Sequence, residues 1–62
     1  MDYFVLNFQD EFSVMVIRSF DDMETIEDAI KAKADWVYLY DERCYINLNN
    51  INCIMRENDD EI

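Results

Sequence analysis

Carboxylates dominate the chemistry that this sequence offers. Fifteen acidic residues stand against five basic ones, so the 62-residue chain carries a formal net charge of −10. Paired carboxylates can act as a glycosidase-like couple or bind a hard cation such as calcium. In so acidic a chain such pairs arise by chance, and residues 21–28 lack the alternating ligands and central glycine of a calcium-binding loop. We therefore expect no metal site.

Several residue types on which catalysis commonly depends are absent. The sequence has no histidine, the commonest general base, and no glycine, which phosphate-binding loops require. The aliphatic hydroxyls of Ser13, Ser19 and Thr25 therefore have no histidine to activate them. A cysteine nucleophile needs a lowered pKa, and the surrounding negative charge acts in the opposite direction. We expect a protein that is not an enzyme, with no catalytic residue and no cofactor.

The densest group of acids lies in residues 21–28. With about 100° per residue on a helix, four of them fall within about a third of the circumference, beside an apolar stripe. Helical neighbours lie about 5–6 Å apart, a spacing comparable to that of phosphates along a nucleic-acid strand. Two interpretations stay open, a solvated helix face near a favourable N-terminus and a partner-binding row of charge. The row would comprise Asp21, Asp22, Glu24, Glu27 and Asp28, with Asp41 and Glu42 as a second row.

Five strand-like segments and one helical segment must position these residues. The two apolar runs in residues 3–8 and 12–18 flank a short polar break, which predicts a β-hairpin. Helical spacing predicts a helix at residues 22–34, with start signals at Asp21 and at Thr25. Strand patterns return after the helix, at residues 36–40, 44–48 and 51–56, with turns at residues 41–42 and 49–50.

The element order is therefore β-β-α-β-β-β, an α+β fold in which one helix covers one face of an antiparallel sheet of four to five strands. We expect a single domain at residues 1–57 and a frayed acidic tail at residues 58–62.

Apolar residues occur on both faces of several expected strands, and one helix covers only one face. A homodimer packed sheet to sheet, or a partner protein, would cover the other face. The alternative is a sheet that curls strongly enough to bury both sides itself. In the first case we expect a second interface at Tyr3, Val5, Tyr38 and Tyr40. Aromatic residues between acids, as in residues 35–42, can also hold a basic cleft through cation–π contacts, although ordinary core packing is the favoured explanation for these aromatics.

The two cysteines are expected to be free thiols. If residues 44–48 and 51–55 form a hairpin, Cys44 faces Met55 and Cys53 faces Ile46, so the two sulfur atoms are not opposite each other. Without a signal peptide or a long apolar run, we expect a cytoplasmic protein.

The overall profile resembles the small, acidic, phage-encoded inhibitors that block host DNA- or RNA-binding proteins. The resemblance covers size, charge and a β-rich plan with one helix; it includes no motif, so no functional residue is carried over. It implies a DNA mimic in the host cytoplasm that binds a basic, nucleic-acid-binding protein, and neither nucleic acid nor a membrane. Two alternatives remain, a homodimeric structural or adaptor module that binds through its apolar sheet face, and an antitoxin-like neutraliser of a basic toxin.

Overall fold

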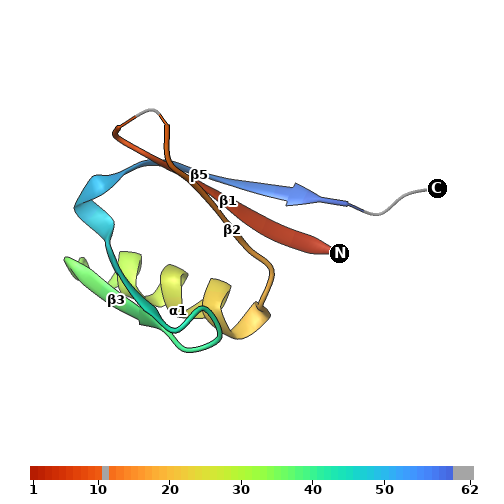
Figure 1. The fold of residues 1–62 in the computed structure, drawn as a ribbon. Helices are drawn as coiled ribbons and strands as arrows, with labels where there is room; N and C mark the ends of the chain where they lie inside the picture. Colours follow the sequence, from red (N-terminus) through yellow and green to blue (C-terminus); the bar gives the residue numbers. More distant parts are fainter. Residues whose placement is uncertain (11, 60–62) are drawn as a thin grey trace.

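A computed structural model describes residues 1–10 and 12–59 of the chain. Five strands and one α-helix follow one another in the order β-β-α-β-β-β, which confirms the expected α+β class and element order (Figure 1). The elements are β1 (Asp2–Phe8), β2 (Val14–Ile17), α1 (Phe20–Lys31), β3 (Trp36–Leu39), β4 (Cys44–Asn47), the short 3-10 helix η1 (Leu48–Asn50) and β5 (Ile51–Asn58).

The strands form two antiparallel sheets instead of one. The three-stranded sheet has the order β2-β1-β5, and β3 pairs with β4 in the second sheet. The expected hairpin between residues 44–48 and 51–55 is wrong, because β5 pairs with β1 and not with β4. The Asn49-Asn50 pair that suggested a hairpin turn lies in η1, where the Asn47 side chain accepts a hydrogen bond from the backbone N–H of Asn49 (2.9 Å). This turn carries the chain from one sheet to the other.

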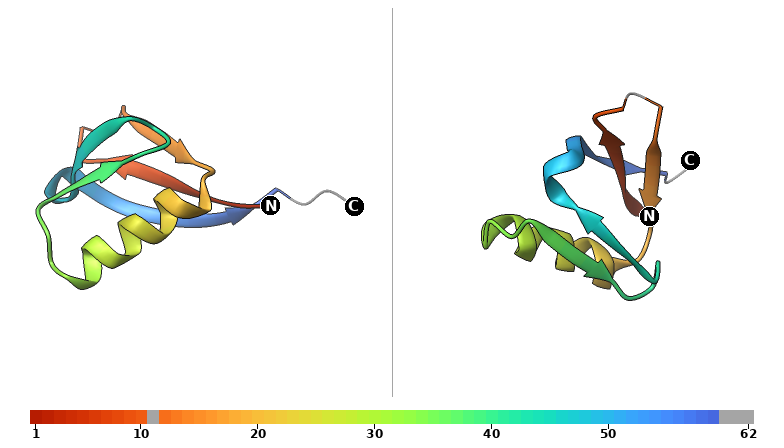
Figure 2. Two further views of the ribbon diagram at one scale, coloured as in Figure 1. Left: turned by 90° about the horizontal axis from the view of Figure 1, so that it is seen from below. Right: turned by 60° about the vertical axis from the view of Figure 1, so that its left-hand side comes forward.

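One core lies between α1 and the inner faces of both sheets (Figure 1, Figure 2). The helix packs mainly along β3, while β1 supplies the centre of the three-stranded sheet. The side chains that are completely or almost completely buried come from every layer: Phe4, Leu6, Ile17, Met23, Ile26, Val37, Leu39 and Ile46.

Helix α1 begins two residues before the expected start and ends three residues before the expected end. Ser19 is its N-cap, and the Ser19 hydroxyl accepts a hydrogen bond from the backbone N–H of Asp22 (3.2 Å). Neither Asp21 nor Thr25 caps the helix. At the C-terminal end, Lys33 has a positive φ of 58°, and the N–H groups of residues 33 and 34 close the last turn with bonds of 3.0 Å each. Lys33 thus holds the left-handed position that glycine usually takes.

The N-terminus and the end of β5 lie at the same end of the three-stranded sheet (Figure 1). The Asp59 carboxylate is paired with Arg18 (2.7 Å) and with the α-amino group of Met1 (3.0 Å). Because β5 includes Asn58, the ordered chain continues past the expected start of the tail. Residues 60–62 of that tail lie outside the described residues. Among the described residues, no helix has the length and apolarity needed to cross a bilayer.

Candidate functional site

Four of the five predicted helix acids form one exposed surface on α1. Asp21, Glu24, Glu27 and Asp28 are all exposed, and the buried side chains of the helix point the other way, into the core. None of the four carboxylates makes an ion pair with another described residue. The helix therefore presents a continuous run of unneutralised negative charge.

Asp22 does not belong to this surface, so its predicted partner-binding role is wrong. Its side chain is 1% exposed, and its two carboxylate oxygens accept hydrogen bonds from the backbone N–H groups of Asp41 (3.3 Å) and Glu42 (3.2 Å). Asp22 lies about 100° further around the helix than Asp21, so its side chain points towards the core and away from the exposed acids. Asp22 is a positioning residue that fastens the turn between β3 and β4 to the start of α1.

The fastened turn lies beside the start of α1. Asp41 and Glu42 are exposed in this turn, and the Ser19 hydroxyl donates a hydrogen bond to the Asp41 carboxylate. We call the six exposed carboxylates the acidic surface: Asp21, Glu24, Glu27, Asp28, Asp41 and Glu42. A local signal for this arrangement exists in the sequence, since Ser19 and Asp22 have the spacing of a capping box. The start signals at Asp21 and Thr25, which have the same spacing to an acid, competed with it.

A groove of about 330 Å³ runs beside the acidic surface, between α1 and the three-stranded sheet. Its apolar lining comes from Phe4 and Met23, which are buried, and from Phe20, which is exposed. Acidic side chains of α1 also line it. Such a groove suits a lysine or arginine side chain, whose methylene stem packs on apolar atoms while its charged head meets carboxylates. The lining residues are Phe4, Phe20, Asp21, Met23, Glu24, Glu27 and Arg56.

Arg56 of β5 limits the acidic surface on this side, and no local pattern in the sequence predicts its position. Its guanidinium donates two hydrogen bonds to one carboxylate oxygen of Asp2, at 3.2 and 2.7 Å. This hydrogen bonding with Asp2, and to a smaller extent the charge of Glu27, raises the pKa of Arg56. The groove therefore has a fixed positive charge at one end, already paired with Asp2.

The four residues of the predicted second interface lie on two different sheets. Tyr3 and Val5 belong to β1 in the three-stranded sheet, whereas Tyr38 and Tyr40 lie on or just after β3. Tyr38 makes edge-on ring contacts with Tyr40 and Tyr45, with centroid distances of 4.9 and 4.8 Å. The structure thus contains an aromatic cluster on the β3-β4 sheet and a separate apolar face on the β2-β1-β5 sheet.

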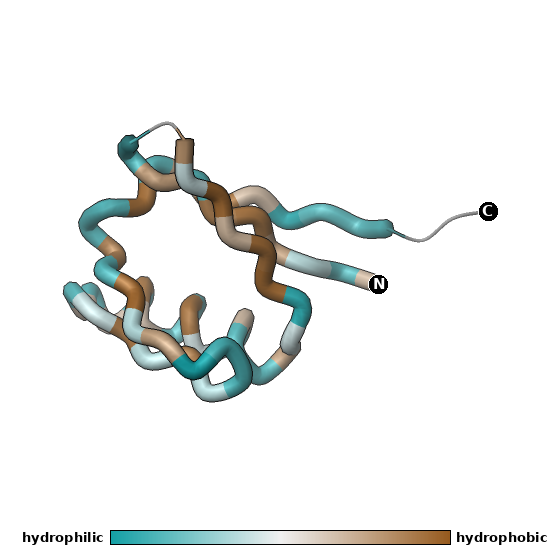
Figure 3. The backbone as a smooth tube through the Cα atoms, in the orientation of Figure 1, coloured by the Kyte–Doolittle hydropathy of each residue, from teal (hydrophilic) through white to brown (hydrophobic). Residues whose placement is uncertain are grey.

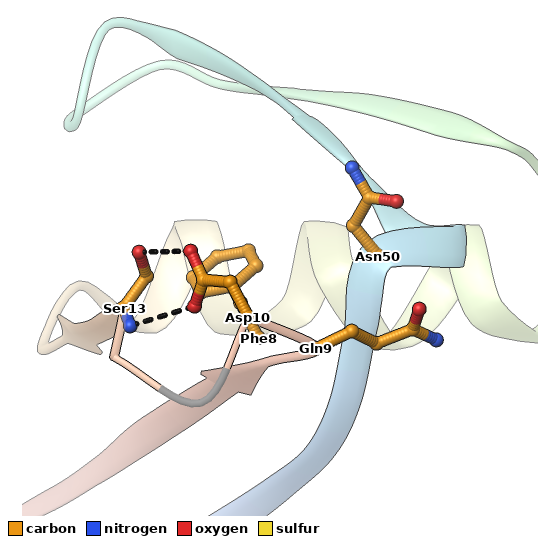
Figure 4. Close-up of a pocket in the computed structure, with 5 residues that line it drawn as sticks. All are labelled: Phe8, Gln9, Asp10, Ser13 and Asn50. Carbon is orange, nitrogen blue, oxygen red and sulfur yellow. Dashed lines mark hydrogen bonds between the residues drawn. The ribbon is translucent and has the colours of Figure 1, made fainter.

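Another pocket, of about 600 Å³, lies beside the loop between β1 and β2 (Figure 4). The Asp10 carboxylate there accepts bonds from the Ser13 hydroxyl (2.7 Å) and from the N–H groups of Ser13 (2.8 Å) and Phe12 (3.0 Å). The Ser13 hydroxyl, followed by the backbone donors, lowers the pKa of Asp10. These bonds hold the turn in place. Asp10 therefore has a structural role in this turn.

Neither cysteine has the surroundings of a reactive nucleophile. Both are free thiols, and they lie in different sheets, Cys44 in β4 and Cys53 in β5. Burial, followed by the charges of Glu42 and Asp22, raises the pKa of Cys44, so the thiol form is favoured. Cys53 is exposed and its sulfur accepts a hydrogen bond from the Asn7 amide (3.5 Å). No group of three or more possible metal ligands occurs among the described residues.

Comparison of the chain with protein-family models, with curated proteins and with solved structures found no match.

Proposed function

We propose that this protein binds a basic, nucleic-acid-binding protein through the acidic surface and thereby keeps nucleic acid out of that protein's site. One observation carries the proposal. Four exposed carboxylates follow one another along α1, and the bonds of Asp22 to the backbone of residues 41 and 42 keep two more, Asp41 and Glu42, beside the start of that helix. The target and this protein would share a compartment, the host cytoplasm if the chain is phage-encoded.

The charge of the surface would act in two stages. At long range, a net charge of −10 steers a positively charged cleft towards the protein, at a rate that falls as salt screens the field. At contact, acids three and four positions apart on α1, such as Glu24 and Glu27 or Glu24 and Asp28, lie about 5–6 Å apart and meet the cations that normally hold successive phosphates. The groove would accept the stem of one such lysine or arginine against Phe20 and Met23.

The test is a pull-down from bacterial lysate with the tagged protein, eluted in steps with salt and then with duplex DNA. The decisive variant neutralises α1 by the four changes Asp21→Asn, Glu24→Gln, Glu27→Gln and Asp28→Asn. A matched control exchanges the same residues within their charge class, Asp21→Glu, Glu24→Asp, Glu27→Asp and Asp28→Glu. We expect a nucleic-acid-binding protein that both eluents release, that the control retains and that the neutral variant does not retain. Wild-type affinity in the neutral variant would refute the proposal.

The adaptor alternative depends on an apolar sheet face in place of the acids. Partner binding would then be insensitive to salt, and substitutions at Tyr3 or Val5 would weaken it more than the loss of any carboxylate. The same pull-down therefore separates the two functions.

A further inference from the structure

The three-stranded sheet has an apolar outer face that no described element covers. Its centre is a row across all three strands, because Val5 of β1 pairs with Val16 of β2 and with Met55 of β5. Val16 and Met55 are each 42% exposed, and Val14 in the next row is 57% exposed. α1 and β3 lie on the opposite side of the sheet (Figure 1). Figure 3 shows how frequent hydrophobic residues are along β1 and β2, counting both faces of the sheet. We call this surface the outer face.

Among the described residues, the charges on the outer face stand at one end, and they are balanced. Tyr3 of β1 pairs with Glu57 of β5, and the register of β1 with β2 places Arg18 next to Tyr3 on its other side. The Arg18 guanidinium lies 4.6 Å from the centroid of the Tyr3 ring, which confirms that it projects onto this face. Its nearest partner, Asp59, also pairs with the α-amino group of Met1. The described part of the chain therefore places two positive groups, Arg18 and the α-amino group, and two negative groups, Glu57 and Asp59, at this end of the face.

We propose that the outer face binds the outer face of a second copy of this chain, with a two-fold axis parallel to β1. Such an axis lays β2 of one copy over β5 of the other and keeps each row at the same height along the strands. Arg18 then lies over Glu57 of the second copy, and the reverse pair forms by symmetry. An axis perpendicular to β1 would instead place Arg18 over the row of Val14 and would give Glu57 no cation across the contact, which is costly in an apolar interface.

The packing geometry of sheets permits these pairs. Facing sheets lie about 10 Å apart and cross at about 30°. If the two sheets cross at Val5, the row of Tyr3 lies two residues from the crossing point. A crossing angle of about 30° then displaces this row by only about 3–4 Å relative to the facing row of the second copy. Arginine and glutamate side chains are long enough to span this offset. Charge complementarity therefore selects one arrangement of the two copies.

The small area of the outer face limits the affinity of the dimer. The strand spacing of about 4.8 Å makes the face about 15 Å wide and, from Tyr3 to Asn7, about 14 Å long. That is well below the area of about 800 Å² per partner in a stable interface. We therefore expect a weak dimer with a dissociation constant of about 10–500 µM. The acidic surface projects from α1 on the other side of the sheet, so added salt should reduce repulsion between copies and strengthen the dimer.

Sedimentation equilibrium at about 10–500 µM protein tests the proposal through a charge-swap cycle. Arg18→Glu and Glu57→Arg should each weaken dimerisation about tenfold, and the double variant should restore it to within about twofold of wild type. Val16→Lys should abolish the dimer, whereas Ile30→Lys, which places the same charge at a 48%-exposed apolar position on α1, should not. Because Arg18 also holds Asp59, thermal melts accompany that variant. The variants Glu57→Arg and Val16→Lys alter no ion pair between described residues.

A monomer at every concentration, or a double variant as weak as the single ones, would overturn the proposal. Wild-type dimerisation of Val16→Lys would do the same. This test can fail without affecting the proposed function. Partner binding is measured at protein concentrations below the dimer dissociation constant, and it should weaken with salt, whereas the dimer should strengthen.

Discussion

Replacing Asp22 by alanine should destabilise the protein more than replacing any other carboxylate. The Asp22 side chain is 1% exposed, and its two oxygens accept bonds of 3.3 and 3.2 Å from the backbone of residues 41 and 42. A bond to a charged group contributes about 1.5–3 kcal/mol. These two bonds are long, so the lower value applies to each. Because water can reach the amides of the exposed Asp41 and Glu42, we expect a total loss of about 2–3 kcal/mol.

That loss is large for a chain of this length. At about 0.05–0.15 kcal/mol per residue, 62 residues give a free energy of unfolding of about 3–9 kcal/mol. Since each kcal/mol shifts the melting temperature of a small domain by about 4–8 °C, Asp22→Ala should melt about 10–20 °C below wild type. Circular dichroism melts and urea titrations followed by Trp36 fluorescence measure both quantities. Asp22→Asn keeps one acceptor oxygen, so its loss should be about half as large.

The matched control is Asp21→Asn. It removes the same charge one position earlier, at an exposed side chain without an ion pair to another described residue. Its stability should stay within about 0.5 kcal/mol of wild type. An Asp22→Ala variant as stable as wild type, or an equal loss in Asp21→Asn, would refute the positioning role of Asp22.

Three further predictions follow from local geometry. Lys33→Gly should raise the free energy of unfolding by about 1 kcal/mol in urea titrations, because Lys33 holds a positive φ that glycine adopts without cost. Hydrogen bonding to Arg18 and to the α-amino group lowers the pKa of Asp59, so its stabilising contribution is present above about pH 4 and is lost as pH falls through the folded-state pKa. Thermal melts from about pH 7 to pH 2 should accordingly show a smaller acid-side loss in Asp59→Asn than in wild type, and an equal loss would contradict the pairing. In Ellman titrations Cys53 should react faster than Cys44, whose pKa is raised by burial; the reverse order would contradict the structure.

Local patterns predicted those parts of the fold that depend on neighbours in the sequence. The β1–β2 and β3–β4 hairpins both join strands across short polar breaks, and the helix shows a clear apolar stripe. The N-cap was also within reach, since Ser19 precedes Asp22 by three positions. Choosing between several similar capping signals requires knowledge of which residue turns towards the core, and spacing alone does not supply it.

Contacts between distant segments explain the rest. β1 pairs with β5, so Phe4 meets Arg56 across 52 positions, and no turn signal marks such a pairing. The division into two sheets then separates Tyr3 and Val5 from Tyr38 and Tyr40. The burial of Asp22 has the same origin, because the amides that satisfy it come from a turn about 20 residues away. A carboxylate in an acidic run looks exposed until its partner segment is known.

The most direct test of the central claim is a titration of the captured nucleic-acid-binding protein against wild type at about 0.05 to 0.5 M NaCl, with and without duplex DNA. The acidic surface predicts a dissociation constant that rises steeply with salt, competition by DNA, and no measurable binding by the variant with four neutral residues on α1. A dissociation constant that is unchanged by salt, by DNA and by the loss of those four charges would contradict it.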